Sequence, residues 1–266
     1  MDLAHIIALA CVQGLTEFLP VSSSAHLVLV PVLFSWPDQG LAFDVATHLG
    51  TLIAVVSHFA MELKSMARSV FRPSAADPNT VVNRRMVGYL IVASLPAIGA
   101  GLGLVHLMAG GWREPWVIGS ATIGFGLLLG LADYRYRNDD THVAINLPRA
   151  VVIGFAQALA LIPGTSRSGV TITAGLMLGM SRVESARFSF LLSIPVILAA
   201  ASYGALTVVQ AQAVIEWREF LLAVGFSAIA GFVCLRLFLR FVEKVGMMPY
   251  VIYRCGLGVA ILVIML

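Results

Sequence analysis

The sequence predicts an all-α integral membrane protein with six transmembrane helices plus two re-entrant helical hairpins, arranged as two inverted-topology repeats. Three observations lead to this prediction: the apolar composition, the lengths of the apolar segments, and a polar motif that occurs twice. Of the 266 residues, 59% are hydrophobic and only 12% are charged, and the mean hydropathy is +0.92. An ordinary soluble domain is far less apolar, so most of the chain is expected to lie in lipid.

Charge and cysteine content argue against other classes of protein. The 17 basic and 14 acidic residues give a formal net charge of +3, and they form no basic stripe, so no nucleic-acid partner is expected. Cys11, Cys234 and Cys255 lie in apolar stretches without metal-ligand spacing, which predicts core thiols rather than disulfides or a zinc site. The N-terminus lacks a basic region followed by a cleavage site, so its first apolar run is expected to stay in the mature protein.

Six apolar segments are long enough to cross a bilayer, which takes roughly 20 residues per helix. They cover residues 41–62, 86–108, 115–132, 186–210, 219–241 and 247–266. Two further apolar regions, residues 3–34 and 145–180, are interrupted by Pro, Gly, Ser and charged residues. We therefore expect each of these two regions to form a re-entrant hairpin.

The distribution of basic residues predicts the orientation in the membrane. Four loops are rich in Lys and Arg and are expected in the cytoplasm, whereas the loops with Arg113 and Arg218 carry one basic residue each and are expected outside. Successive loops must alternate between the two sides of the membrane, so both hairpins are expected to return to the side they left. The same alternation places both termini, including Leu266, outside. The four cytoplasmic loops contain Lys64, Arg68, Arg72, Arg84 and Arg85; Arg135, Arg137 and Arg149; Arg182 and Arg187; and Arg236, Arg240 and Lys244.

The two hairpins share a polar motif, and each is followed by three crossing helices. This order predicts a single membrane domain over residues 1–266, with pseudo-repeats at 1–135 and 145–266 whose broken helices meet at the midplane. With one deleted residue, the motif aligns Gln13, Pro20, Ser22 and Ser23 with Gln157, Pro163, Thr165 and Ser166.

Ionisable residues within apolar segments are candidate site residues, because each costs about 2.5–3.5 kcal/mol on insertion scales. Glu17, His26 and Arg167 are clear cases and Asp44 is a weaker one. Gln13 and Glu17 are four residues apart and share one helix face. Their oxygens could bind a hard cation, Mg²⁺ or Ca²⁺, if phosphate and water complete the shell.

The serine run of the first hairpin suits an anion. Pro20 ends one helix, and Ser22, Ser23 and Ser24 can cap the next, which leaves backbone N–H groups for a phosphate. His26 follows Ser23 by three residues, so its imidazole could take a proton from a serine or a water, or protonate the leaving phosphate.

The second hairpin contains Arg167 among hydroxyls and glycines, where its planar fork suits a phosphate. Together the two hairpins predict a phosphoryl-transfer site with a charge-balancing cation and arginine, a nucleophile and an acid/base. Structural alternatives exist: Glu17 could simply pair with Arg167, His26 could hydrogen-bond a carbonyl, and the serines could only cap a helix. The candidate phosphate-binding residues are Ser22, Ser24, Thr165, Ser166, Arg167, Ser168 and Thr171.

Two motifs resemble those of the undecaprenyl-diphosphate phosphatases of bacteria, the bacitracin-resistance type of membrane phosphatase. Gln13 and Glu17 match a Glu-or-Gln followed four residues later by Glu, and residues 163–171 match PGxSRSxxT. The resemblance spans the whole chain. It implies hydrolysis of undecaprenyl diphosphate to the monophosphate carrier for peptidoglycan synthesis, bacitracin resistance, a divalent cation, and a site in the bacterial cytoplasmic (inner) membrane that opens to the periplasmic face.

The same resemblance implies that Glu17, Ser23, His26 and Arg167 form the catalytic group, and that Gln13 and Glu17 hold the metal. Gln13 stands where many members have Glu, so the metal site has one fewer charge. The alternative is a lipid-phosphate flippase, since inverted repeats are a transporter architecture; the grouping of Glu17, Ser23 and His26 favours the enzyme. The sequence leaves five points open: the preferred prenyl chain length, the physiological ion, whether serine or water is the nucleophile, whether the protein is a monomer or a homodimer, and whether it also flips lipid.

Overall fold

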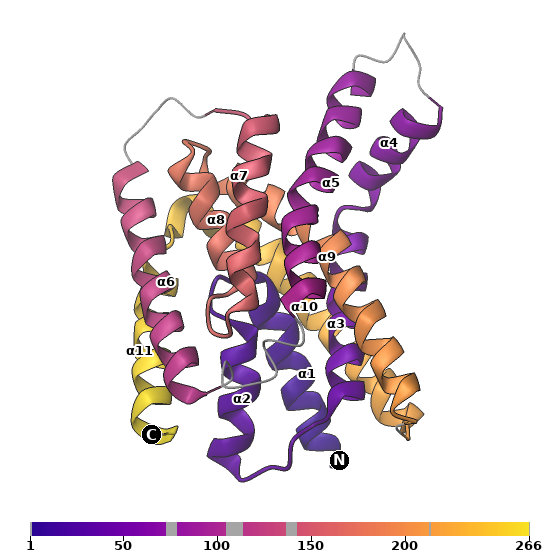
Figure 1. Cartoon of the computed structure of the whole chain (residues 1–266), viewed down its shortest axis with the longest axis vertical. Coiled ribbons are helices and arrows are strands. Elements are labelled where there is room, and N and C mark those ends of the chain that lie inside the picture. Colours follow the sequence, from indigo (N-terminus) through magenta and orange to yellow (C-terminus); the bar gives the residue numbers. More distant parts are fainter. Residues whose placement is uncertain (1, 73–78, 105–113, 137–142, 213, 266) are drawn as a thin grey trace.

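The computed structural model describes residues 2–72, 79–104, 114–136, 143–212 and 214–265. Every regular element in these ranges is helical (Figure 1), as predicted. The elements are α1 (Leu3–Phe18), α2 (Ser23–Phe34), α3 (Leu41–His58), α4 (Ala60–Phe71), α5 (Asn79–Leu104), α6 (Pro115–Tyr136), α7 (Leu147–Ala158), the 3₁₀ turn η1 (Leu159–Leu161), α8 (Arg167–Met177), α9 (Arg182–Gln210), α10 (Trp217–Val245) and α11 (Met248–Met265).

Six helices in the described ranges are long and apolar enough to cross a membrane, namely α3, α5, α6, α9, α10 and α11. These are the six segments expected from hydropathy. Large apolar side chains such as Leu95, Leu206 and Val263 are exposed on them, which suits contact with lipid rather than water. The chain is therefore a multi-pass membrane protein. Residues 105–108, Arg113, Arg137 and Leu266 were part of the sequence predictions and lie outside the described residues.

The two regions predicted as hairpins each form a pair of shorter helices. Figure 1 shows α1 and α2 rising from one end of the molecule and turning back near its middle, while α7 and α8 do the same from the other end. Their turns touch: the Gly164 N–H donates to Ser24 Oγ at 3.4 Å, and Ser168 Oγ donates to the Leu19 carbonyl at 2.9 Å. This contact brings the two polar motifs together.

One helix was missed by the sequence analysis. The segment predicted to cross at residues 41–62 ends at His58, and the part expected to continue as a basic loop begins with the helix α4. Asn83 of α5 donates to the hydroxyls of Ser65 and Ser69 on α4, at 2.8 and 3.3 Å. This helix is too short and too charged to appear as a membrane span, although its apolar and charged residues are spaced as in an amphipathic helix.

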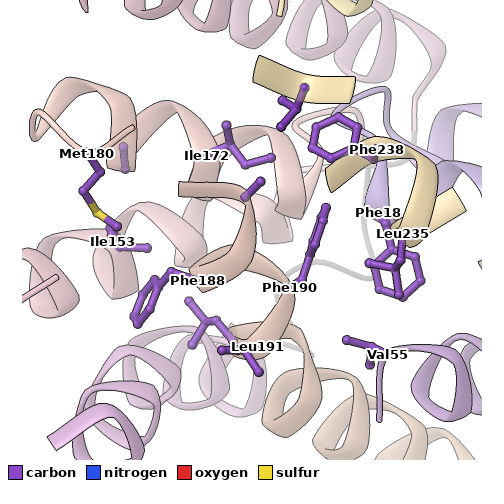
Figure 2. Close-up of a cluster of buried hydrophobic side chains, with 14 of the residues drawn as sticks. Phe18, Val55, Ile153, Ile172, Met180, Phe188, Phe190, Leu191, Leu235 and Phe238 are labelled. Atoms are coloured by element: carbon purple, nitrogen blue, oxygen red, sulfur yellow. The ribbon is translucent and has the colours of Figure 1, made fainter. Parts of the chain in front are cut away.

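The main apolar core lies beside the paired turns (Figure 2). The ring of Phe190 on α9 packs edge-on against Phe18 at the end of α1, with centroids 5.7 Å apart, and against Phe238 of α10, at 5.5 Å. All three side chains are buried. This packing fixes α9 against α1 and so places Ser189 at the site described below.

Small residues let α1 and α3 approach α10 closely. A Cβ atom on Gly14 would lie 2.6 Å from the Ser227 carbonyl oxygen, and one on Gly50 would collide with the Ser227 hydroxyl and the Val224 carbonyl. Packing of backbones at this distance is a common source of helix association in membranes.

We expect Gly50→Ala to lower the free energy of unfolding by about 1–3 kcal/mol, because the added methyl group overpacks the α3–α10 contact. Thermal unfolding of the detergent-solubilised protein measures this. Gly225→Ala on α10 is the matched control, since a Cβ there meets no atom within 4 Å. Equal melting temperatures for the two variants would contradict this account of the packing.

Candidate functional site

A buried ion pair joins the two helix pairs. Arg167 Nη2 at the start of α8 lies 3.0 Å from Glu17 Oε1 near the end of α1, and the two side chains are only 12% and 9% exposed. The residues are 150 positions apart in the chain. The pairing that sequence analysis raised as a structural alternative is therefore formed, and it brings the expected acid and the expected anion-binding arginine into contact.

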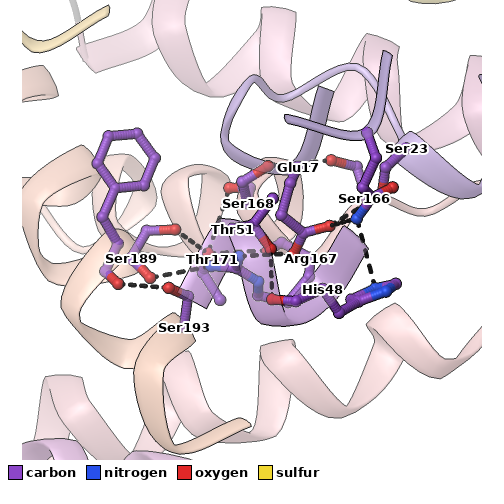
Figure 3. A network of polar contacts seen from close by, with 12 residues as sticks. Glu17, Ser23, His48, Thr51, Ser166, Arg167, Ser168, Thr171, Ser189 and Ser193 are labelled. Atoms are coloured by element: carbon purple, nitrogen blue, oxygen red, sulfur yellow. Dashed lines mark hydrogen bonds and ion pairs between the residues drawn. The ribbon is translucent and has the colours of Figure 1, made fainter. Parts of the chain in front are cut away.

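The second oxygen of Glu17 accepts from two further side chains (Figure 3). Gln13 Nε2 donates to Oε2 at 2.9 Å, as expected for residues four apart on one helix face, and the Ser23 hydroxyl donates to the same oxygen at 3.1 Å. Ser23 is the first residue of α2. A hydroxyl in direct contact with a carboxylate can transfer its proton to that carboxylate.

His48 of α3 extends this network, although nothing in the sequence singled it out. Its Nε2 lies 3.4 Å from Gln13 Nε2, and its Nδ1 lies 2.7 Å from the Asp44 carbonyl oxygen. The Asp44 carboxylate accepts from Gln39 at 3.1 Å, so Asp44 contributes to the network through its backbone. No spacing along the chain links α3 to α1, so only the fold could identify His48.

The other side of Arg167 is held by α9. Arg167 Nη1 donates to the Ser189 carbonyl at 3.1 Å, and the Ser189 hydroxyl lies 2.7 Å from Thr171 Oγ1, one turn along α8 (Figure 3). Both terminal nitrogens of the guanidinium thus have protein partners. An incoming phosphate would have to share the arginine with Glu17.

The two turns have the same unusual backbone. Ser22 and Ser166, which directly precede α2 and α8, have φ angles of 71° and 68°. The Ser166 hydroxyl caps α8 by accepting from the Gly169 N–H at 3.1 Å. The capping predicted for Ser22 is wrong: its hydroxyl makes no cap bond and lies 3.2 Å from Ser24 Oγ instead. The first-turn N–H groups of α2 are therefore left without a side-chain cap, which suits an anion.

His26 makes the hydrogen bond to a carbonyl that the sequence analysis raised as a structural alternative, and it has no hydrogen bond to Ser23 in the described part of the chain. Its Nδ1 lies 2.7 Å from the Ser22 carbonyl oxygen and its Nε2 lies 2.6 Å from the Tyr253 hydroxyl. A helical side chain points back over the preceding turn, which directs the imidazole to the Ser22 backbone. Glu17, not His26, is thus the ionisable side chain that accepts a hydrogen bond from the Ser23 hydroxyl.

Two buried oxygens at the site lack a protein partner in the described ranges, Thr165 Oγ1 and Gln13 Oε1. Buried polar atoms in native structures are nearly always hydrogen-bonded, so both atoms are suited to a bound ligand. The described residues contain no group of three or more His, Cys, Asp and Glu that could hold a metal. The three cysteines are free.

Sequence reasoning also missed Arg254, because the last apolar segment was read as a plain crossing helix. This arginine is fully buried on α11 and donates to backbone carbonyls in both turns. Arg182 and Arg187, expected only to anchor the cytoplasmic side, pair with Asp133 at 2.6 Å and with Glu62 at 2.5 Å.

The chain is similar in sequence to one protein family model and to several curated proteins. Residues 6–260 match the family model "Bacitracin resistance protein BacA". Undecaprenyl-diphosphatase 2 of Stutzerimonas stutzeri is 52% identical over 99% of this chain and 98% of its own length. The undecaprenyl-diphosphatases of Chromohalobacter salexigens and Nitrosococcus oceani are 48% and 47% identical, over 99% and 97% of this chain and the same shares of their own lengths.

We expect Glu17 and Arg167 to be strongly coupled in stability. Removing one partner leaves a buried charge uncompensated, so Glu17→Gln and Arg167→Gln should each destabilise the protein. The double variant should lose less stability than the sum of the two single losses, with a coupling energy of about 1–3 kcal/mol. Unfolding of the four proteins in detergent measures this coupling.

The matched control is the pair of Arg187 and Glu62, whose side chains are 33% and 23% exposed. Its coupling should stay below about 1 kcal/mol, as for other partly exposed pairs. Equal coupling in the two cycles would show that burial does not distinguish the Glu17 pair.

Proposed function

The chain belongs to the bacitracin resistance protein BacA family, and we propose that it hydrolyses undecaprenyl diphosphate to undecaprenyl phosphate and inorganic phosphate at the site around Glu17 and Arg167. It is a membrane phosphatase that recycles the lipid carrier of cell-envelope synthesis and confers resistance to bacitracin. One observation carries the assignment of the site: a carboxylate, a serine hydroxyl and an arginine meet where the N-termini of α2 and α8 converge.

The diphosphate binds between the two turns. Arg167 and the first-turn N–H groups of α2 and α8 balance its charge. The free hydroxyl of Thr165 donates to a phosphate oxygen. The surrounding hydroxyls of Ser22, Ser24, Ser166, Ser168 and Thr171 complete a polar lining in an otherwise apolar interior.

Glu17 acts as the general base and Ser23 as the nucleophile. Glu17 Oε2, which already accepts from the Ser23 hydroxyl at 3.1 Å, takes its proton as Ser23 Oγ attacks the terminal phosphorus. The bond from this phosphorus to the bridging oxygen breaks, and undecaprenyl phosphate leaves. Water then attacks the phosphorus of the phosphoserine, and the bond from this phosphorus to Ser23 Oγ breaks. Glu17 returns its proton to Ser23 Oγ, and inorganic phosphate leaves with the oxygen and protons of the water. Arg167 stabilises the charge that develops on the transferred group.

Glu17 and the unpartnered oxygen of Gln13 would hold a Mg²⁺ or Ca²⁺ ion, and phosphate oxygens and water would complete its shell. When bound, the cation neutralises part of the negative charge of the diphosphate. With a single carboxylate from the protein, we expect this cation to enter with the substrate.

We further propose that the two helix pairs are re-entrant and belong to inverted repeats, residues 1–135 and 145–266. Gln13 and Ser22 are nine positions apart, as are Gln157 and Ser166, and both serines have φ near 70°. This correspondence supports the repeat and needs no deleted residue, unlike the alignment made from sequence. The broken helices then meet at the midplane of the bilayer.

The site opens to the periplasmic face of the inner membrane in this proposal. Figure 1 shows that α1 begins and α11 ends at one end of the molecule, while α4 and the start of α7 lie at the other. The latter end carries the basic residues Lys64, Arg68 and Arg149, and the positive-inside rule assigns it to the cytoplasm.

Phosphate release from undecaprenyl diphosphate by the purified protein tests the function. Glu17→Ala and Arg167→Ala should each reduce kcat/KM by at least about 100-fold, because each removes a group that acts in the transition state. Ser23→Ala should do the same if Ser23 attacks, whereas substantial residual activity would identify water as the nucleophile. A chelator should abolish release by the wild type.

Arg187→Ala, which affects an ion pair away from the turns, is the control and should retain activity within about threefold. The proposed phosphatase activity would be wrong if the folded wild type released no phosphate with any cation. If the same protein moved a labelled lipid phosphate across vesicle membranes, the function would be that of a flippase.

The topology has its own test. We expect a cysteine-reactive, membrane-impermeant label to reach a cysteine added after Leu266 from the outside of intact cells. A cysteine introduced at exposed Met61 at the start of α4 serves as the control and should react only after the membrane is opened. The opposite pattern would reverse the orientation.

A further inference from the structure

Arg254 of α11 contacts both turns. Its guanidinium donates to four backbone carbonyls: from Nε to Thr122 at 3.1 Å, from Nη1 to Pro20 at 3.4 Å, and from Nη2 to Gly164 at 3.1 Å and Thr165 at 2.8 Å. Pro20 belongs to the first turn, Gly164 and Thr165 to the second, and Thr122 to α6. One side chain therefore contacts three elements distant in sequence.

The environment of Arg254 is costly for a cation. The side chain is 0% exposed, and all its hydrogen-bond partners in the described part of the chain are carbonyl oxygens rather than carboxylates. Burial of a charge without an opposite charge is strongly unfavourable unless hydrogen bonds satisfy it. Only the planar fork of arginine can reach several acceptors at once, so these carbonyls account for its presence.

The turns that Arg254 contacts are conformationally strained. Ser22 and Ser166 occupy the left-handed region, at φ 71° and 68°, which is unfavourable for a residue with a side chain. Such conformations persist only where the surrounding structure holds them. The turns therefore need external contacts, and the carbonyl of Thr165, directly before Ser166, is the closest acceptor of Arg254.

The neighbouring residue, Tyr253, reaches the first turn through His26. The two rings are parallel within 5°, and the Tyr253 hydroxyl lies 2.6 Å from His26 Nε2. A carbonyl oxygen can only accept, so the 2.7 Å contact from His26 Nδ1 to the Ser22 carbonyl puts the imidazole proton on Nδ1. Nε2 then accepts from Tyr253, and the chain of bonds holds the strained Ser22 peptide.

We propose that Tyr253 and Arg254 are positioning residues that hold the two phosphate-binding turns in fixed positions relative to each other. This proposal rests on the proposed function of the turns. Within a trans peptide unit the C=O and N–H groups point in opposite directions. Holding the carbonyls of Ser22 and Thr165 from the α11 side aims the N–H groups of Ser23 and Ser166 away from α11, toward the gap where Glu17 and Arg167 meet.

Two conservative changes test the proposal without removing the buried arginine. A Cβ on Gly126 of α6 would lie 3.1 Å from Arg254 Cβ and 3.4 Å from its Nε, so Gly126→Ala displaces the guanidinium; a Cβ on Gly124, two residues earlier, meets nothing within 4 Å. Tyr253→Phe removes one hydroxyl, and Tyr250→Phe, on the same helix, is its matched control.

Three quantities are measured: kcat per folded molecule and KM, both for phosphate release, and the rise in melting temperature on adding inorganic pyrophosphate. We expect Gly126→Ala and Tyr253→Phe to lower kcat by about 10- to 100-fold, to change KM by less than about threefold, and to reduce the pyrophosphate-induced shift. Gly124→Ala and Tyr250→Phe should match the wild type. Arg254→Lys, which keeps the charge and loses the fork, should resemble Gly126→Ala.

A merely structural role would lower the melting temperature and leave kcat per folded molecule and the pyrophosphate shift unchanged, and that result would overturn the proposal. The wild type could instead be stabilised by pyrophosphate yet release no phosphate. If Gly126→Ala and Tyr253→Phe then reduced the pyrophosphate-induced rise in melting temperature, the positioning role would be supported and the phosphatase activity would be rejected. The two proposals are therefore separable in one set of proteins.

Discussion

The ion pair between Glu17 and Arg167 is the interaction on which the rest of the site depends. It joins the end of α1 to the start of α8 at 3.0 Å, and every other contact of the site is arranged around it. Gln13 and Ser23 occupy the second carboxylate oxygen, and Ser189 occupies the second guanidinium nitrogen. In a medium of low dielectric constant two opposite charges are costly to separate. The pair therefore defines how the two helix pairs meet, and it holds a carboxylate beside a serine hydroxyl.

A second constraint follows from the apolar surroundings. Backbone groups in a membrane must find partners within the protein, so irregular chain is tolerated only where the protein itself satisfies it. The two turns meet this requirement with side chains from other elements: Ser168 donates to the Leu19 carbonyl, Ser24 accepts from Gly164, and Arg254 donates to both turns. Ser168 and Arg254 satisfy carbonyl groups of the turns, and Ser24 satisfies the Gly164 N–H, while the helix N-termini remain suited to an anion. At two peptide groups, those that end in the N–H of Ser23 and of Ser166, a side chain holds the carbonyl and the N–H is left for the anion.

The main differences between expectation and structure concern side-chain direction. His26 was expected to exchange a proton with a serine, a water or the leaving phosphate, and a hydrogen bond to a carbonyl was the structural alternative. That hydrogen bond is formed, since the imidazole contacts the Ser22 carbonyl and the Tyr253 hydroxyl. Ser22 was one of three serines expected to cap α2, yet its hydroxyl lies against Ser24 Oγ, whereas Ser166, with a similar φ, caps α8. Spacing along a helix identifies which residues share a face. It does not identify their partners when the helix begins at a strained residue.

The sequence by itself determined the membrane class, the six crossing helices, the two interrupted regions and the polar residues Gln13, Glu17, Ser23 and Arg167. These follow from local properties: apolar length, the cost of charge in lipid, and helical spacing. Only the tertiary structure decided the roles of His48, Ser189, Tyr253 and Arg254, which come from α3, α9 and α11. Their contacts with the two turns span large separations in the chain, and they depend on how six helices pack around a shared core. Neither hydropathy nor motif spacing contains that information, because both describe a residue only by its neighbours in sequence.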